Sequence, residues 1–232
     1  MGNNETKEMG KEIPHGIKKM EARGDNLFSI EYTDGSTFLG NLVNHKKQGH
    51  GKLIFANGEH FEGNFEKDFM HGKGVYVTDD LRYEGDWEKG TQTGEGVETW
   101  KDGSQYKGAF ENGVKHGMGE YKWNDGTEFT GEWKQGQMHG FGRFIFKNGS
   151  VYKGFWVKGK RHGKGELISK RGQVYNGDFA NDKKHGHGTL KFTNGQKYVG
   201  TFLNNKPDGK GKLYQKDGTF ITGIWKKGNL VQ

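Results

Sequence analysis

Apolar side chains alternate with glycine and polar residues in short runs along the chain. From Tyr198 to Phe202, aromatic, glycine and aromatic residues occupy every second position, and residues 186–192 repeat this spacing. A period of two is typical of a β-strand that buries one face. The pattern therefore predicts paired strands, each with its apolar side chains on the same face.

The connection between these two strands decides which residues lie opposite each other. A two-residue Asn-Gly turn would send Leu190 and Phe192 to the face opposite Tyr198. A three-residue loop over Thr193, Asn194 and Gly195 would pair Leu190 with Tyr198 and keep all the apolar side chains together. We predict the three-residue loop, because its last position needs a positive φ, which glycine adopts without penalty.

The same hairpin recurs along almost the whole chain. Aromatic-x-Gly frames, with Ile in place of the aromatic residue at the last, recur at a fixed period of about 23 residues, which indicates a stacked repeat protein. One interval is shorter because it lacks a residue between Gly74 and Asp79, which predicts a shifted or shortened strand pairing there. The glycines of the frame are Gly40, Gly63, Gly85, Gly108, Gly131, Gly154, Gly177, Gly200 and Gly223.

One stretch carries a resemblance to a known family. Residues 152–165 read YKGFWVKGKRHGKG and resemble the MORN motif, Y-x-G-x-W-x-x-G-x-x-H-G-x-G. Nine such repeats cover residues 27–232, although Gln48, Thr93 and Asp208 replace the motif's histidine. The resemblance implies an all-β fold, a single elongated twisted antiparallel sheet built as a meander of β-hairpin repeats in an open, solenoid-like rod. Residues 1–26 are expected to form a flexible polar N-terminal arm.

The apolar face of this sheet is the first candidate binding surface. Because each repeat contacts only its neighbours, the resemblance implies a face that stays open unless a partner covers it. We predict that an aromatic groove binds a helix or an extended segment of a protein partner. The groove residues are Tyr83, Trp87, Tyr106, Phe110, Tyr121, Trp123, Phe129, Trp133, Phe144, Tyr152, Trp156, Tyr175 and Phe179.

Charge distinguishes the two halves of the chain. Residues 1–116 contain 15 Lys and Arg against 20 Asp and Glu, whereas residues 117–232 contain 21 against 9. Clustered cations can bind anionic lipid or an acidic partner, or can form a solvated edge that prevents aggregation. The opposite charges also leave a homodimer open. The candidate cations are Lys153, Lys158, Lys160, Arg161, Lys164, Lys170 and Arg171.

The N-terminus supplies a lipidation candidate. Residues 1–6, MGNNET, fit the N-myristoylation pattern M-G-x-x-x-[ST], with Gly2 as the acceptor. A single myristoyl chain binds membranes only marginally, so the basic half would have to supply the second signal. The alternative is an unmodified, disordered N-terminus.

Catalytic and metal chemistry find little support. The chain has no cysteine, which excludes disulfides and thiolate chemistry. The column of His71, His116, His139, His162 and His185 places equivalent residues about 9.6 Å apart, too far to share one ion. Phosphate-loop, kinase and hydrolase motifs are absent, and no reader motif for nucleic acid accompanies the aromatic residues. We expect no enzyme activity, no cofactor, no metal and no nucleic-acid binding, and no run of 18 apolar residues could span a membrane.

Two functions from different classes remain. The first is a cytoplasmic, non-enzymatic scaffold for a cytoskeletal, ciliary or motor-associated protein, located at the cytoskeleton, cilium or cell cortex, as the resemblance implies. The alternative is a peripheral membrane adaptor that binds anionic phospholipid through the basic C-terminal half. An enzyme is kept only as a third alternative.

Overall fold

The computed structural model describes residues 16–232, which form β-strands, turns and loops. No helix among these residues is long and apolar enough to cross a membrane. The chain divides into two compact units, unit 1 up to Asn124 and unit 2 from Asp125 to Gln232. Each unit is described by itself.

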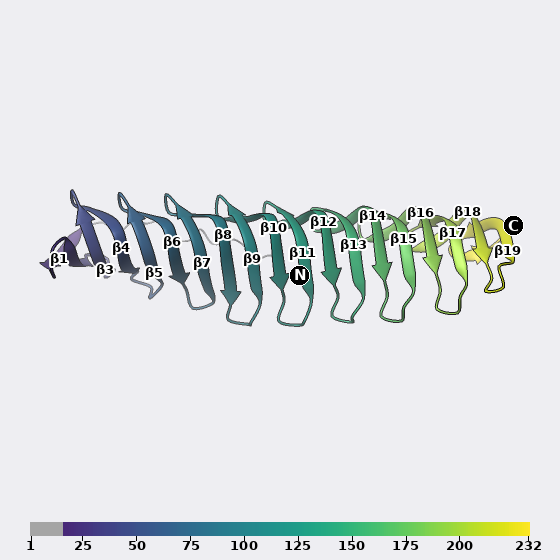
Figure 1. Cartoon of the computed structure of the whole chain (residues 1–232), viewed down its shortest axis with the longest axis horizontal. Helices are drawn as coiled ribbons and strands as arrows, with labels where there is room; N and C mark the ends of the chain where they lie inside the picture. Colours follow the sequence, from purple (N-terminus) through teal and green to yellow (C-terminus); the bar gives the residue numbers. More distant parts are fainter. Residues whose placement is uncertain (1–15) are drawn as a thin grey trace. The chain divides into compact units, whose positions relative to one another are not determined.

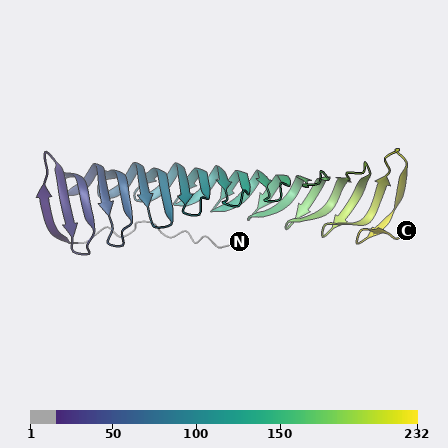
Figure 2. The ribbon, with the colours of Figure 1, turned by 90° about the horizontal axis from the view of Figure 1, so that it is seen from below.

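Within each unit, consecutive strands pair antiparallel, as Figures 1 and 2 show. The predicted all-β meander of hairpins is therefore confirmed. The strands of unit 1 are β1 (Ile17–Ala22), β2 (Leu27–Tyr32), β3 (Thr37–Val43), β4 (Lys46–Ile54), β5 (His60–Glu66), β6 (Phe69–Val77), β7 (Leu81–Glu88), β8 (Thr91–Trp100), β9 (Gln105–Glu111) and β10 (Val114–Lys122). Those of unit 2 are β11 (Glu128–Lys134), β12 (Gln137–Ile145), β13 (Val151–Val157), β14 (Lys160–Ile168), β15 (Val174–Ala180), β16 (Lys183–Lys191), β17 (Lys197–Leu203), β18 (Lys206–Tyr214), β19 (Phe220–Lys226) and β20 (Asn229–Leu230).

The sheet begins earlier than the sequence indicated. Strand β1 pairs with β2, and Met20 lies opposite Ile30. The expectation of a flexible arm up to residue 26 is wrong for residues 17–22. Their side chains are mostly exposed, so they lack the buried alternation by which the other strands were recognised. Residues 1–15, including the myristoylation candidate Gly2, lie outside the described residues.

Turns of two kinds alternate along the meander. Strands β15 and β16 are joined by Asn181 and Asp182, whose φ angles of 47° and 69° define a two-residue type I′ turn. Strands β16 and β17 are joined by the predicted three-residue loop, where Gly195 has a φ of 89°. Leu190 accordingly pairs with Tyr198, which confirms the predicted register.

The short interval of the repeat leaves the strand register intact. Strands β6 and β7 pair without a shift from Gly72 opposite Trp87 to Val77 opposite Arg82. The Thr78 nitrogen donates a hydrogen bond of 2.8 Å to the Leu81 carbonyl, which closes a loop shorter than the others. The expectation of a shifted or shortened pairing is wrong, because the loop absorbs the missing residue.

A bulge bends the strands toward their apolar face, which is called the inner face here. Between β13 and β14 the register shifts after the Gly154–Gly165 pair. Bulges of this kind bend the strand that carries them. Arg161 lies opposite Trp156, at the other end of β13 from Ser150, to which Phe146 is hydrogen-bonded. In a flat sheet these levels would be about 20 Å apart, yet the Arg161 guanidinium lies 5.5 Å from the Phe146 ring. The two ends of the strands therefore bend toward each other over the inner face, where the aromatic rings are buried.

Candidate functional site

The predicted aromatic groove is mostly the core of the protein. Tyr83, Tyr106, Phe129, Tyr152 and Tyr175 have an exposed fraction of zero. Only Trp123 and Phe144 of the thirteen predicted groove residues are half-buried. The expectation that these rings line an open face is therefore corrected, because the bend of the strands covers them. The other buried groove residues are Trp87, Phe110, Tyr121, Trp133, Trp156 and Phe179.

The buried rings contact one another edge to face. The Tyr152 ring lies 5.3 Å from Trp156 at 87° and 5.0 Å from Phe179 at 80°. Its hydroxyl donates a 3.0 Å hydrogen bond to the Phe155 carbonyl. Burial raises the pKa of Tyr152 to about 12, an effect that the positive charge of Arg161 opposes. The ring of Tyr152 therefore packs entirely against other residues of the chain and has no exposed surface for a partner.

A second column of aromatic residues borders the groove where it opens to solvent. Each residue directly precedes a loop with glycine at its third position and remains half-buried. Of these residues, only Trp123 was predicted from the sequence. The signal was present, since these positions recur with the period of the repeat, but they fall outside the aromatic-x-Gly frame. In unit 1 this column contains Phe55, Trp100 and Trp123, and in unit 2 it contains Phe146 and Phe192.

In four repeats, the second residue of the strand after the two-residue turn is a cation on the inner face, namely Lys47, Lys115, Arg161 or Lys184. Lys115 donates a 2.5 Å hydrogen bond to Glu98 Oε2, and both side chains are largely buried. The Lys115 ammonium also lies 4.8 Å from the centroid of the Trp100 ring. Lys47 holds the corresponding place in an earlier repeat, 5.4 Å from the Tyr32 ring. We call these side chains, with the half-buried aromatic column, the groove mouth.

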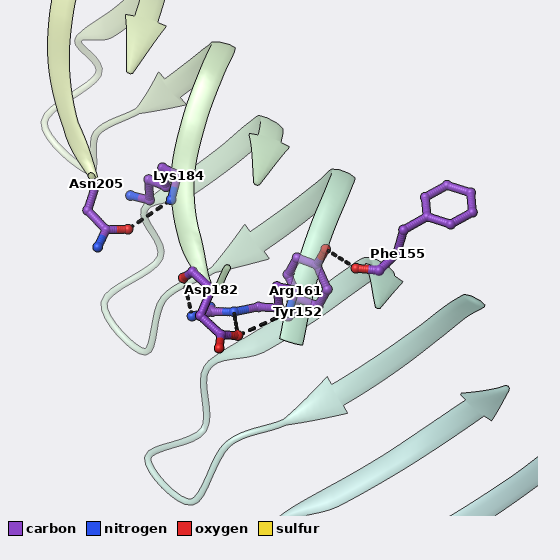
Figure 3. Close-up of polar contacts among 6 residues, drawn as sticks. All are labelled: Tyr152, Phe155, Arg161, Asp182, Lys184 and Asn205. Carbon is purple, nitrogen blue, oxygen red and sulfur yellow. Dashed lines mark hydrogen bonds and ion pairs between the residues drawn. The ribbon is translucent and has the colours of Figure 1, made fainter. Parts of the chain in front are cut away.

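For two of these cations, Lys47 and Arg161, the carboxylate that neutralises the charge comes from the following two-residue turn along the chain. Asp68 Oδ1 accepts a 2.9 Å hydrogen bond from the Lys47 backbone nitrogen and lies 3.6 Å from its ammonium. In unit 2, Asp182 Oδ1 accepts from the Arg161 backbone nitrogen at 3.0 Å and from its Nε at 3.3 Å. Arg161 Nη2 also donates a 2.7 Å hydrogen bond to the Asp182 carbonyl (Figure 3).

Lys184 departs from this arrangement. Asn205 stands at the turn position of Asp68 and Asp182, and its Oδ1 accepts a 2.9 Å hydrogen bond from the Lys184 backbone nitrogen. The dashed line at Lys184 in Figure 3 ends on that nitrogen and not on the ammonium. Burial, and then the positive charge of Arg161, lower the pKa of Lys184. Among residues 16–232, no carboxylate forms an ion pair with Lys184.

The predicted basic cluster is dispersed in the structure. Lys158 lies in the two-residue turn between β13 and β14 and Lys160 directly follows that turn, whereas Lys170 and Arg171 lie in the loop between β14 and β15. The whole length of β14 separates these two ends. The remaining candidates lie on the strands, with Arg161 on the inner face and Lys153 and Lys164 on the outer face. The prediction of one basic cluster is therefore wrong, because alternate strand residues face opposite sides.

No metal site emerges from the part of the chain that the structure describes. Within residues 16–232, no group of three or more His, Asp or Glu side chains could hold an ion. His71 instead lies 3.3 Å from Glu66, and His116 lies 3.1 Å from Glu111. These two histidines therefore each contact a carboxylate of the adjoining strand.

The repeated hairpins and their shared inner core define a protein built from stacked β-hairpin repeats. The sequence model of the MORN repeat matches eight consecutive segments, and the chain belongs to the MORN-repeat family. The ninth predicted repeat, around Gly223, lies outside the matched residues. The matched segments are 38–60, 61–80, 83–105, 106–128, 129–151, 152–174, 175–197 and 198–220.

Other comparisons are more distant. No curated protein sequence matches the chain. The TCP domain of Drosophila melanogaster SAS-4 (dCPAP), solved in complex with a proline-rich motif of Ana2 (dSTIL), is 14% identical, with a TM-score of 0.35 over 84% of this chain and 100% of that domain. The wild-type TCP10 domain of Danio rerio CPAP is 12% identical, with a TM-score of 0.42 over 85% of this chain and 99% of that domain. Neither likeness is close enough to bear on function.

Proposed function

We propose that this MORN-repeat chain is a non-catalytic scaffold that binds a protein partner along the groove mouth. The observation that carries the proposal is the contrast between the buried inner rings and the half-buried column above them, which includes Phe146 and Phe192. Aromatic side chains that stay partly exposed beside cations are typical of the anchoring residues of protein interfaces. The partner therefore contacts the mouth and not the rings beneath it.

The cellular setting follows from family resemblance. The MORN repeats of this chain resemble those of adaptors of the cytoskeleton, cilium and cell cortex. We therefore propose a cytoplasmic protein that holds a cytoskeletal, ciliary or motor-associated partner.

Affinity capture with matched variants tests the proposed surface. Phe192→Ser removes a half-buried ring from the groove mouth, whereas Phe155→Ser removes an exposed ring from the outer face of the same unit. We expect partners captured from native extract by the wild-type chain to be lost with Phe192→Ser and retained with Phe155→Ser, as judged by quantitative mass spectrometry. The opposite pattern would assign binding to the outer face and contradict the proposal.

A second function is favoured by the outer face of unit 2. Residues 125–232 carry 20 Lys and Arg against 8 Asp and Glu. Phe141 and Phe155 are 52% and 49% exposed on this face, with ring centroids 5.7 Å apart. Cations and exposed aromatic rings together suit the surface of an anionic membrane. Unit 2 would then act as a peripheral membrane adaptor, with or without a myristoyl group on Gly2.

Co-sedimentation with vesicles separates the two functions. Vesicles that contain phosphatidylserine should retain the chain at low salt, and Phe155→Ser should weaken this retention. If neither the unmodified nor the myristoylated chain binds at low salt, the membrane function is excluded. Phe192→Ser serves as the control that should leave vesicle binding unchanged.

A further inference from the structure

Lys184 is an inner-face cation whose charge no carboxylate among residues 16–232 balances in an ion pair. Its ammonium lies 5.1 Å from the centroid of the Tyr175 ring, and the side chain is half-buried. Removing a charge from water is costly unless an opposite charge compensates it. After burial, the charge that lowers the pKa of Lys184 is that of Arg161, which has the same sign. An anion at this place would therefore be bound favourably.

The first reason why the site is open is a missing ring. In the other repeats with an inner-face cation, the residue directly before the preceding three-residue loop carries a ring that contacts the cation. Tyr32 contacts Lys47 in this way, and Trp100 contacts Lys115. For Lys184 that residue is Ser169, a small residue whose Oγ accepts a hydrogen bond from the Gln173 nitrogen.

The second reason is a missing carboxylate. The turn position that holds Asp68 after Lys47, and Asp182 after Arg161, holds the uncharged Asn205 after Lys184. The repeat that contains Lys184 thus lacks both the ring and the carboxylate.

We propose that Lys184 binds a carboxylate of an acidic segment of the partner protein, at the place that Ser169 and Asn205 leave open. The segment presents one Asp or Glu to the ammonium, with an apolar residue beside it that contacts the half-buried ring of Phe192. This inference rests on the proposed scaffold function and names the chemistry of the partner. Charge complementarity carries it, because unit 2 has a large excess of cations and this inner-face cation has no ion pair within the described part of the chain.

Two pairs of variants isolate the site. Lys184→Met removes the cation, and its control Lys183→Met makes the same change at the adjacent, exposed position on the outer face. Asn205→Asp supplies the missing carboxylate from within the chain, and its control Asn204→Asp makes the same change at the preceding turn position. Asn204 and Asn205 both have a positive φ, 49° and 73°, which Asp tolerates. All variants are made in the full chain and compared by thermal unfolding.

A library of random dodecapeptides displayed on phage is selected on the wild-type chain, and the best peptides are measured by fluorescence anisotropy. We expect the peptides to share an Asp or Glu next to an apolar residue. Their affinity should fall about tenfold or more with Lys184→Met and with Asn205→Asp, as for the loss of one charged hydrogen bond. The controls Lys183→Met and Asn204→Asp should retain binding. If Lys184→Met fails to fold, Asn205→Asp carries the test.

Several outcomes would overturn the inference. These are a library without binders, peptides without acidic residues, or acidic peptides that bind Asn205→Asp as well as they bind the wild type. If the Asn205→Asp variant no longer binds phosphatidylserine vesicles, the site is assigned to lipid. If a homodimer of the wild type dissociates in this variant, the site is assigned to a second copy of the chain. If peptide binding is lost with Phe192→Ser but not with Lys184→Met or Asn205→Asp, the proposed scaffold function is supported and the role of Lys184 is contradicted.

Discussion

Lys115 in unit 1 and Lys184 in unit 2 occupy the same place in their repeats but have different surroundings. Lys115 contacts Glu98 at 2.5 Å and the Trp100 ring at 4.8 Å, so its charge is satisfied within the chain. Lys184 has an aromatic ring beneath it and no carboxylate partner among the described residues. The two repeats therefore share one backbone arrangement. Single residues decide whether the inner-face cation is paired with a carboxylate of the chain or is available to bind a ligand.

The largest change in stability is expected from breaking the buried Lys115–Glu98 ion pair. Glu98→Gln leaves the Lys115 ammonium buried without its carboxylate, a loss of about 3 kcal/mol in the free energy of unfolding. Urea denaturation of the variant measures this loss. The control Glu95→Gln removes an exposed carboxylate from the same strand and should change stability by less than about 0.5 kcal/mol. A loss below about 1 kcal/mol for Glu98→Gln would show that the pair contributes little.

Asp182→Asn should remove from Arg161 the turn carboxylate that Lys184 also lacks. The variant keeps an oxygen for the Arg161 backbone nitrogen and removes only the negative charge. Because the Asp182 side chain is 46% exposed, solvent screens the pair, and we expect a loss of only about 1.5 kcal/mol. Chemical denaturation checks the value. An unchanged stability would mean that the hydrogen bond from the Arg161 backbone nitrogen to the side-chain oxygen at position 182, and not the charge, holds Arg161 in place.

Asn205→Asp is the reverse change and should stabilise unit 2. The new carboxylate would lie beside an inner-face ammonium that has no counterion, a gain of about 1 kcal/mol at neutral pH. A higher melting temperature than that of Asn204→Asp would support this view. A melting temperature at or below the wild-type value would show that Lys184 is already compensated by solvent.

The smallest effect is the pH dependence of that gain. Burial and Arg161 lower the pKa of Lys184 in the folded chain, so its charge opposes folding below that pKa. In the wild type, the contribution of Lys184 to the free energy of unfolding therefore becomes more favourable as pH increases from the lowered pKa toward the unfolded value of 10.5. The advantage of Asn205→Asp should shrink over the same interval, as thermal unfolding from pH 7 to 10 would show. A constant advantage would contradict the assignment to Lys184.

The fold was predictable because its signals are local. The pairing of Leu190 with Tyr198 followed from the parity of a three-residue loop and from the tolerance of Gly195 for positive φ. The strand at Ile17–Ala22 was missed because an exposed edge strand needs no apolar alternation. The candidate site was predicted only in part. Trp123 was identified, but Phe146 and Phe192 fall outside the aromatic-x-Gly frame.

The repeat, the hairpins and the register follow from local features of the amino-acid sequence, since period-two alternation and turn glycines act within a few residues. What those hairpins enclose depends instead on contacts between residues that are distant in the sequence. The bend at the bulges buries Tyr152 and its equivalents, and it brings Lys47, Lys115 and Arg161 near the ring that precedes the previous three-residue loop. Whether a residue of the next two-residue turn neutralises the cation depends on the pairing of neighbouring hairpins. For Arg161 that residue is Asp182, whereas for Lys184 it is the uncharged Asn205.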